Sequence, residues 1–257
     1  MNNKRDISMI ALLFFITRAF FNTYNFNNIF SFLLINILIL ISIYLLKKIK
    51  VNILKYKIIK YIYLIIISII FIIMLKIASN FINNNYFKYS NYFVIILTLL
   101  ITSYFLGRDD IKTISSISEI FLIIFIITSL IICIGLISLI NINNFNGYFK
   151  LDITSFNYIP LLIVFIILYL RGNNIIIGYS LGTLSILIDN ILLVGCLGNK
   201  LLLKYKFPGI SILKSLNLFN FINHVDKFFS IIYLFEYTIT LALIFFIIKN
   251  LIKKRAN

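Results

Sequence analysis

The sequence predicts an all-α protein, a polytopic integral membrane bundle of about eight transmembrane helices, each about 20 residues long. Hydrophobic residues make up 61% of the 257 positions, charged residues only 12%, and the mean hydropathy is +1.05. A soluble fold cannot cover so much apolar surface. The apolar residues also fall into separate runs of membrane-spanning length. One composition continues along the chain, so we expect residues 1–257 to form a single transmembrane domain.

The expected spans are approximately residues 7–26, 29–46, 61–79, 91–107, 118–141, 157–170, 175–197 and 228–248. The first follows a basic N-terminus, as the apolar part of a signal peptide does. It has no small-x-small cleavage site, however, and Arg18 and Asn22 interrupt it. We therefore predict that this segment is retained as a helix.

The run 157–170 is shorter than a full span and begins near Pro160. It is a candidate half-helix, whose exposed backbone ends can bind charged groups. The next run, 175–197, contains Gly178 and Gly182 at the spacing that lets a second helix approach closely. Close helix packing and a ligand site that uses Tyr179 or Ser180 are the two interpretations of this stretch.

The positive-inside rule predicts the orientation. Lysines concentrate between Lys47 and Lys60, and basic residues again between Lys249 and Arg255, so both stretches and both termini are expected in the cytoplasm. The loop 198–227 is also rich in lysine, yet it falls outside in this count. Either it packs against the protein as a re-entrant element or one span is miscounted, and its apolar content favours packing.

Several functional classes find no support. The net charge is +16, but the basic residues lie mainly between and beyond the apolar runs, so we expect membrane lipid and no nucleic acid as a partner. Cys133 and Cys196 lie within apolar runs, and a single histidine, His224, gives no metal site and no metal cofactor. No phosphate-binding loop, nucleophile elbow or metalloprotease motif is present, so we predict no enzymatic activity and no cofactor.

Three ionisable residues lie inside the expected spans: Arg18, Asp189 and Glu236. Each costs at least a few kcal/mol at membrane depth unless it is paired or hydrated. In the functional interpretation, Arg18 faces Glu236 or Asp189 across a cavity, where the group recognises a zwitterionic solute or relays a proton. In the structural interpretation, they form a buried ion pair, or Arg18 reaches to the interface. Arg18, Tyr179, Asp189 and Glu236 are therefore the candidate substrate-binding residues.

Two segments resemble the spore germination permease family, the integral membrane B subunit of germinant receptors. The first is Tyr104 to Ile124 (YFLGRDDIKTISSISEIFLII). It has the family's order of a short basic turn, an amphipathic approach and a Ser-Glu pair before an apolar span. Gly107 and Arg108, then Ser118 and Glu119, take these places.

The second segment is Lys206 to Phe229 (KFPGISILKSLNLFNFINHVDKFF). It is similar to the family's outer loop, in which an aromatic-Pro pair, an apolar stretch and an apolar-Asp pair lead into the next span. Phe207 with Pro208, and Val225 with Asp226, take these places. The separation of the two segments also suits the family.

The resemblance places the chain in the amino acid–polyamine–organocation transporter superfamily and implies a LeuT-like fold of two inverted repeats. Members of the family are longer, so the second repeat is expected to be incomplete here. Residues 153–170 also lack the family's Gly and acidic residue.

The resemblance implies a permease-like subunit that senses a small nutrient, such as an amino acid, in the spore inner membrane and signals germination through partner subunits. The alternatives are a stand-alone amino-acid secondary transporter of the cell membrane and a degenerate membrane protein that transports nothing.

Overall fold

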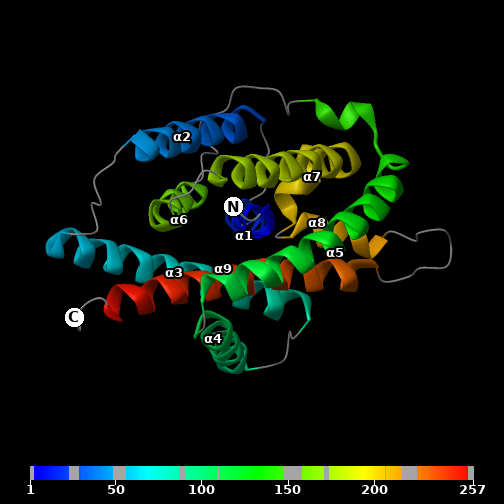
Figure 1. The fold of residues 1–257 in the computed structure, drawn as a ribbon. Coiled ribbons are helices and arrows are strands. Elements are labelled where there is room, and N and C mark those ends of the chain that lie inside the picture. Colours follow the sequence, from blue (N-terminus) through cyan, green and yellow to red (C-terminus); the bar gives the residue numbers. More distant parts are fainter. Residues whose placement is uncertain are drawn as a thin grey trace.

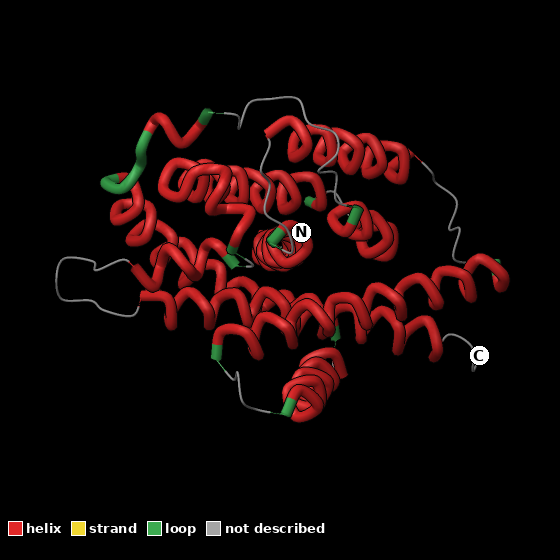
Figure 2. Tube along the Cα trace, turned by 180° about the vertical axis from the view of Figure 1, so that it is seen from behind, coloured by secondary structure: helices red, strands yellow, loops and turns green. Residues whose placement is uncertain are grey.

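The computed structural model describes residues 3–22, 29–48, 56–86, 91–108, 110–146, 158–170, 174–205, 207–215 and 225–253. Every regular element in these ranges is helical (Figures 1 and 2). The α-helices are α1 (Asn3–Phe21), α2 (Ile29–Lys48), α3 (Lys57–Asn85), α4 (Tyr92–Arg108), α5 (Ile111–Ile137), α6 (Ile163–Leu170), α7 (Ile175–Lys204), α8 (Pro208–Ser215) and α9 (Val225–Lys253), and the 3₁₀ helices are η2 (Ile142–Phe145) and η3 (Ile159–Leu162).

The fold class is confirmed as all-α, with helices of membrane-spanning character. Among the described residues, five helices are long and apolar enough to cross a bilayer: α2, α3, α5, α7 and α9. Three shorter apolar segments, Ile7–Phe21, Tyr92–Arg108 and Ile159–Leu170, coincide with the other three expected spans. Several long apolar helices in one chain indicate an integral membrane protein. The count of eight spans stays a prediction.

Helices α1 and α5 each differ at one end from the expected spans. Helix α1 ends at Phe21 rather than at residue 26, because Asn22 lies in a turn and uses its side chain to reach α9. Helix α5 begins at Ile111, before the expected start at 118, because its polar first turns still form helical hydrogen bonds. A hydropathy window finds the apolar part of a helix, whereas the helix itself ends where its backbone hydrogen bonds end.

Helix α1 lies at the centre of the molecule, where Figure 1 shows it nearly end-on, between α7 and α9. It packs most extensively against α7 and also contacts α5, α6 and α9. Every residue from Ala11 to Phe21 is buried. The peripheral helices instead expose large apolar side chains, such as Ile37 on α2 and Ile72 on α3. A bilayer solvates such a surface.

The glycines of the GxxxG pattern hold α7 close to α1. A Cβ atom on Gly178 would lie 2.7 Å from the Cβ of Leu13, and one on Gly182 would lie 2.7 Å from the Cβ of Thr17. Both distances are too short for two carbon atoms that are not bonded to each other. The close-packing interpretation of these glycines therefore agrees with the structure.

We expect Gly182→Val to force α7 away from α1. Overpacking in a well-packed core costs about 1–3 kcal/mol, so the thermal unfolding temperature of the purified protein in detergent should fall clearly. Leu181→Val is the matched control, because Leu181 is 46% exposed on the same helix. An equal change in both variants would contradict the close-packing role.

A kink ends the straight part of α7 at Gly198, whose φ of +71° is in the region that favours glycine. The expected end at residue 197 marks this kink, and the helix resumes to Lys204. The Asn144 side chain of η2 donates a hydrogen bond of 2.7 Å to the Gly195 carbonyl, and the Asn141 backbone N–H donates a second. These donors satisfy a carbonyl near the kink, where the regular helical pattern is interrupted.

We expect Asn144→Ala to loosen this end of α7. A hydrogen bond of this kind contributes about 0.5–1.5 kcal/mol, so the loss of stability should be smaller than in Gly182→Val. Hydrogen exchange of the amides around residues 195–198 should become faster, while exchange in the middle of α3 stays unchanged. Unchanged exchange at both places would contradict the proposed contact.

The loop 198–227 contains the short helix α8, which packs on α7 and α9. Ile210, Ile212 and Leu213 are buried there. This agrees with the expectation that the apolar loop packs against the protein. His224 lies outside the described residues.

Candidate functional site

Arg18, Asp189 and Glu236, here called the charged cluster, lie on α1, α7 and α9. Arg18 is in the last turn of α1 and is completely buried. The expected span 7–26 would place Arg18 near its middle, but α1 ends at Phe21, three residues after Arg18. A cation in the last turn is favoured by the helix dipole, and the surrounding helices still keep this one away from solvent.

The Arg18 guanidinium contacts both carboxylates. Its Nε donates a hydrogen bond of 2.6 Å to Glu236 Oε1, and its Nη1 lies 2.8 Å from Asp189 Oδ2. Nη1 also donates to the Ser185 hydroxyl at 2.9 Å. The cationic carbon is 4.3 Å from the ring centroid of Phe125, at cation–π distance. No hydrogen-bond partner is found for Nη2 among the described residues.

Glu236, in the middle of α9, has no exposed surface. Arg18 donates to one of its oxygens, and Asn22 Nδ2 donates to the other at 2.7 Å. Both partners are donors, an arrangement that stabilises an ionised carboxylate. Glu236 and Arg18 therefore form a buried ion pair that is well hydrogen-bonded on the carboxylate side.

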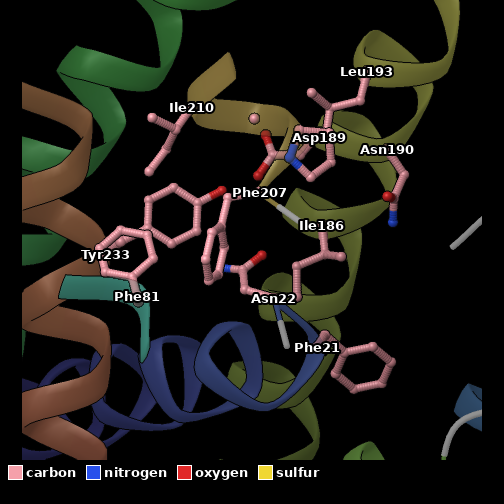
Figure 3. A pocket seen from close by; sticks show the side chains of 12 residues that line it. Phe21, Asn22, Phe81, Ile186, Asp189, Asn190, Leu193, Phe207, Ile210 and Tyr233 are labelled. Carbon is pink, nitrogen blue, oxygen red and sulfur yellow. The ribbon is translucent and has the colours of Figure 1, made fainter. Parts of the chain in front are cut away.

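Asp189 has a different environment. Its side chain is 26% exposed, and its buried Oδ2 approaches Arg18 without the geometry of a hydrogen bond. It lines a cavity of about 40 Å³ together with Asn22, Tyr233 and residues of α8. Figure 3 shows the Asp189 carboxylate and the Tyr233 hydroxyl directed toward the same space, with the Asn22 amide nearby.

A second cavity, of about 30 Å³, lies on the α5 side of Asp189. Four residues line both cavities: Asp189, Leu193, Gly209 and Tyr233. Each cavity is polar at Asp189 and has room for water. Asp189 is thus the accessible charged group of a cluster whose other two members are fully buried.

Among the described residues, the cluster has one cation for two carboxylates, so its three groups together carry one net negative charge when all are ionised. An uncompensated charge in a region of low dielectric is costly. A cationic group that enters through a cavity removes this cost. Binding of a cationic group is the chemistry that this arrangement supports.

Tyr179 lies away from the cluster. It is 1% exposed, and its hydroxyl donates a hydrogen bond of 2.6 Å to Asn36 Oδ1 on α2. Asn36 in turn donates to the Phe32 carbonyl. Tyr179 joins α7 to α2 and lines neither of the two cavities described above. Its expected role in substrate binding stays a prediction.

The sequence analysis did not identify three residues of this site: Asn22, Ser185 and Tyr233. Asn22 and Ser185 form hydrogen bonds with the charged cluster, and Tyr233 lines the cavity beside it. A helical-spacing argument points to two of them. Ser185 precedes Asp189 by four positions and Tyr233 precedes Glu236 by three, and such pairs share a helix face. Asn22 interrupts the first apolar run, but the sequence does not show that it reaches Glu236.

The positions of the first family-like segment lie on α4 and α5. Gly107 packs against α9, where an added Cβ would lie 2.5 Å from the Ala242 carbonyl oxygen. Arg108 is exposed, and its carbonyl accepts a hydrogen bond from Lys249. Ser118 is buried and bonds the carbonyl of its own helix one turn earlier, and Glu119 is half-buried. Gly107 therefore serves a contact between helices, and Arg108 a bond at a helix end.

The second family-like segment reaches the cavity at one position. Pro208 begins α8 and lines the cavity beside Asp189. Asp226 is in the first turn of α9, and its side chain lies outside the described part of the chain. Pro208 is therefore the motif position that the structure brings near the charged cluster.

Comparison with known proteins gives no relative. No family model, no curated protein and no solved structure matches this chain.

Proposed function

We propose that this chain is a permease-like membrane protein that recognises a small nutrient solute, such as an amino acid, at the cavity beside Asp189. The observation that carries the proposal is the charged cluster itself, three ionisable side chains from three apolar helices that meet next to a cavity. Intramembrane charges that face a cavity mark solute or ion pathways in membrane proteins. Pockets with few convergent polar groups are typical binding sites.

The geometry supports a division of roles within the site. Arg18 already contacts two carboxylates, so it is a poor anchor for the carboxylate of a solute. Asp189 is partly exposed, lines the cavity and carries the unbalanced charge, so it would pair with the ammonium group. Arg18 and Glu236 would fix the position of Asp189 and set the local charge.

The more specific proposal is that the protein is the integral membrane subunit of a spore germinant receptor, with eight spans in an incomplete LeuT-like arrangement. The two family-like segments support it, and Pro208, within the second of them, lines the cavity. In this proposal the solute changes the packing of α8 over the site, and partner subunits carry the signal onward.

Solute binding is tested on the purified protein with a panel of labelled amino acids, the matching amines and the matching carboxylic acids. Asp189→Asn should weaken binding of the ammonium-bearing compounds about tenfold or more, since a charged hydrogen bond contributes about 1.5–3 kcal/mol. Asp110→Asn is the control, because Asp110 is an exposed carboxylate at the start of α5. Equal affinity of the two variants for the ammonium-bearing compounds would contradict the role assigned to Asp189.

The receptor assignment is tested in a spore-forming host that carries the protein with a C-terminal tag. Recovery from the spore inner membrane together with soluble-domain or lipoprotein partners supports a receptor subunit. Recovery only from vegetative membranes, without partners, contradicts it.

A stand-alone amino-acid transporter is the second candidate, and the pair of cavities favours it. Residues of α7, α8 and α9 line both cavities, with Asp189 and Tyr233 in the shared wall. Helix α3 and the end of α1 complete the first cavity, and α5 completes the second. A transporter must expose one site to two compartments in turn. Uptake of labelled solute into proteoliposomes that contain only this protein would support the transporter, and binding without uptake would contradict it.

A further inference from the structure

We propose that the cavity beside Asp189 takes a methylated ammonium group, the trimethylammonium head of a compact solute, and prefers it to an unmethylated ammonium group of the same charge. The inference rests on the proposed function, because it names the chemical class of the solute that this cavity would recognise. The aromatic side of the cavity carries it.

Three aromatic side chains, here called the aromatic wall, line the cavity next to Asp189: Phe81 on α3, Phe207 directly before α8 and Tyr233 on α9. Phe81 is 1% exposed, whereas Phe207 and Tyr233 are half-buried. Figure 3 shows the three rings grouped together beside the Asp189 carboxylate. Phe207 and Tyr233 are therefore the rings that a solute in the cavity can contact.

The rings of the aromatic wall pack on one another at different angles. Phe81 stacks on Tyr233 with 5.5 Å between the ring centroids and an angle of 27° between the planes. It meets Phe207 edge to face, at 5.2 Å and 90°. Phe207 and Tyr233 are consequently steeply inclined to each other and form a corner. Because an aromatic ring is negative on its face, a compact cation is attracted into such a corner.

The size of the cavity selects a small head group. Its volume is about 40 Å³. One water molecule needs about 10–15 Å³ of such space, so the cavity has room for roughly three water molecules. A compact head group of a few heavy atoms fits this space, and a bulky side chain does not.

The aromatic wall favours methyl groups on the nitrogen. An unmethylated ammonium group has three N–H donors, and each donor that loses its water needs an acceptor in the cavity. Donors directed at the aromatic wall meet the carbon atoms of Phe81 and Phe207. A trimethylammonium group has no N–H donor. Its methyl groups pack on the rings while its charge lies near the Asp189 carboxylate, and aromatic cages recognise quaternary ammonium groups by this combination.

This preference is separate from the net charge of the site. Lys206, next to Phe207 in the chain, and the side chain of Lys227 lie outside the described part of the protein. A basic group near the cavity would weaken the binding of all monovalent cations alike. Ethanolamine, its N-methyl and N,N-dimethyl derivatives and choline carry the same charge at neutral pH and differ in their methyl groups. The order of their affinities therefore reports the aromatic wall.

The test is binding of this series to the purified full-length protein in nanodiscs, with the neutral tert-butyl analogue of choline as a compound of matched shape. Choline should bind about tenfold more tightly than ethanolamine, and the neutral analogue should bind weakly. Phe207→Leu and Tyr233→Leu should each weaken choline binding about three- to thirtyfold, the range expected for a lost cation–π contact. Tyr233→Phe keeps the ring and should keep the preference. Phe93→Leu is the control, since Phe93 is 66% exposed on α4.

Phe207→Trp keeps the proposal testable if the leucine variants do not fold. The chain contains no tryptophan, so the fluorescence of the introduced indole reports this site alone. Tryptophan is the best aromatic partner of a cation. This variant should bind choline at least as tightly as the wild type, and choline, but not its neutral analogue, should change the emission. An emission that choline leaves unchanged would overturn the proposal.

Failure of the inference and failure of the proposed function give different results. If ethanolamine binds and each added methyl group weakens binding, the cavity is a site for primary ammonium groups, and only the inference is wrong. Equal binding of choline and its neutral analogue shows recognition of shape without charge and also overturns the inference. If no ammonium compound and no amino acid binds to the wild type, the proposed function is rejected together with the inference.

Discussion

Arg18→Ala should destabilise the protein by about 3–5 kcal/mol, the cost of removing one partner from a buried ion pair. The change leaves Glu236 buried with Asn22 as its remaining hydrogen-bond donor among the described residues, and it leaves Asp189 without its cation. It also removes a large side chain between Phe125 and the α7 face. The amount of protein in membranes and its thermal unfolding temperature in detergent should both fall sharply.

Charge and volume are separated by two further variants. Arg18→Met keeps much of the volume and loses the charge, so it should remain strongly destabilised. Combining it with Glu236→Gln and Asp189→Asn removes the buried charges together and should restore most of the stability, because well-packed neutral groups often replace a buried ion pair without loss. Arg108→Ala is the control, since Arg108 is exposed at the end of α4. If Arg18→Ala and Arg108→Ala behave alike, the ion-paired cluster has no structural role.

Gly107→Val should have the second large effect. A Cβ atom at this position would lie 2.5 Å from the Ala242 carbonyl oxygen and 3.1 Å from the Phe245 ring. The nearest obstacle is backbone, which cannot rotate away as a side chain can, so α4 must move off α9. We expect a loss at the upper end of the range for overpacked cores, about 3 kcal/mol.

The measurement is thermal unfolding in detergent, compared with Phe105→Val on the same helix. Phe105 is 62% exposed, so its change should alter stability little. Gly107→Ala should already be destabilised, because the Cβ alone makes the short contact. Wild-type stability in Gly107→Ala would show that the two helices separate easily and would contradict the packing role.

The fold class and the places of most helices follow from the sequence alone. Apolar runs such as 29–46 and 175–197 are long, and membrane-spanning length is a local property that a hydropathy pattern reports directly. The packing of α8, the described part of the expected loop 198–227 beyond α7, was predictable for the same reason, because its apolar content is visible in the sequence. The conspicuous Arg18, Asp189 and Glu236 were identifiable because charges in apolar runs are expensive.

The arrangement of these residues becomes visible only when the helices are packed together. In the folded protein Arg18 contacts both carboxylates at once. Glu236 is completely buried, whereas Asp189 is partly exposed and lines the cavities. Tyr179 lies apart from the cluster and bonds Asn36 on α2. These outcomes depend on the relative rotation of α1, α7 and α9, which long-range packing sets and which no local pattern encodes.

The ends of helices also depend partly on the local sequence and partly on contacts between distant segments. Hydropathy predicted that α1 continues to residue 26, but the helix stops at Phe21, where Asn22 turns to bond Glu236 more than two hundred positions later in the chain. The same holds for the glycines of α7. The spacing of Gly178 and Gly182 predicted a close helix contact, but the sequence did not show that the partner is α1. Composition and spacing fix which segments become apolar helices, and the contacts between distant segments fix which charge remains accessible.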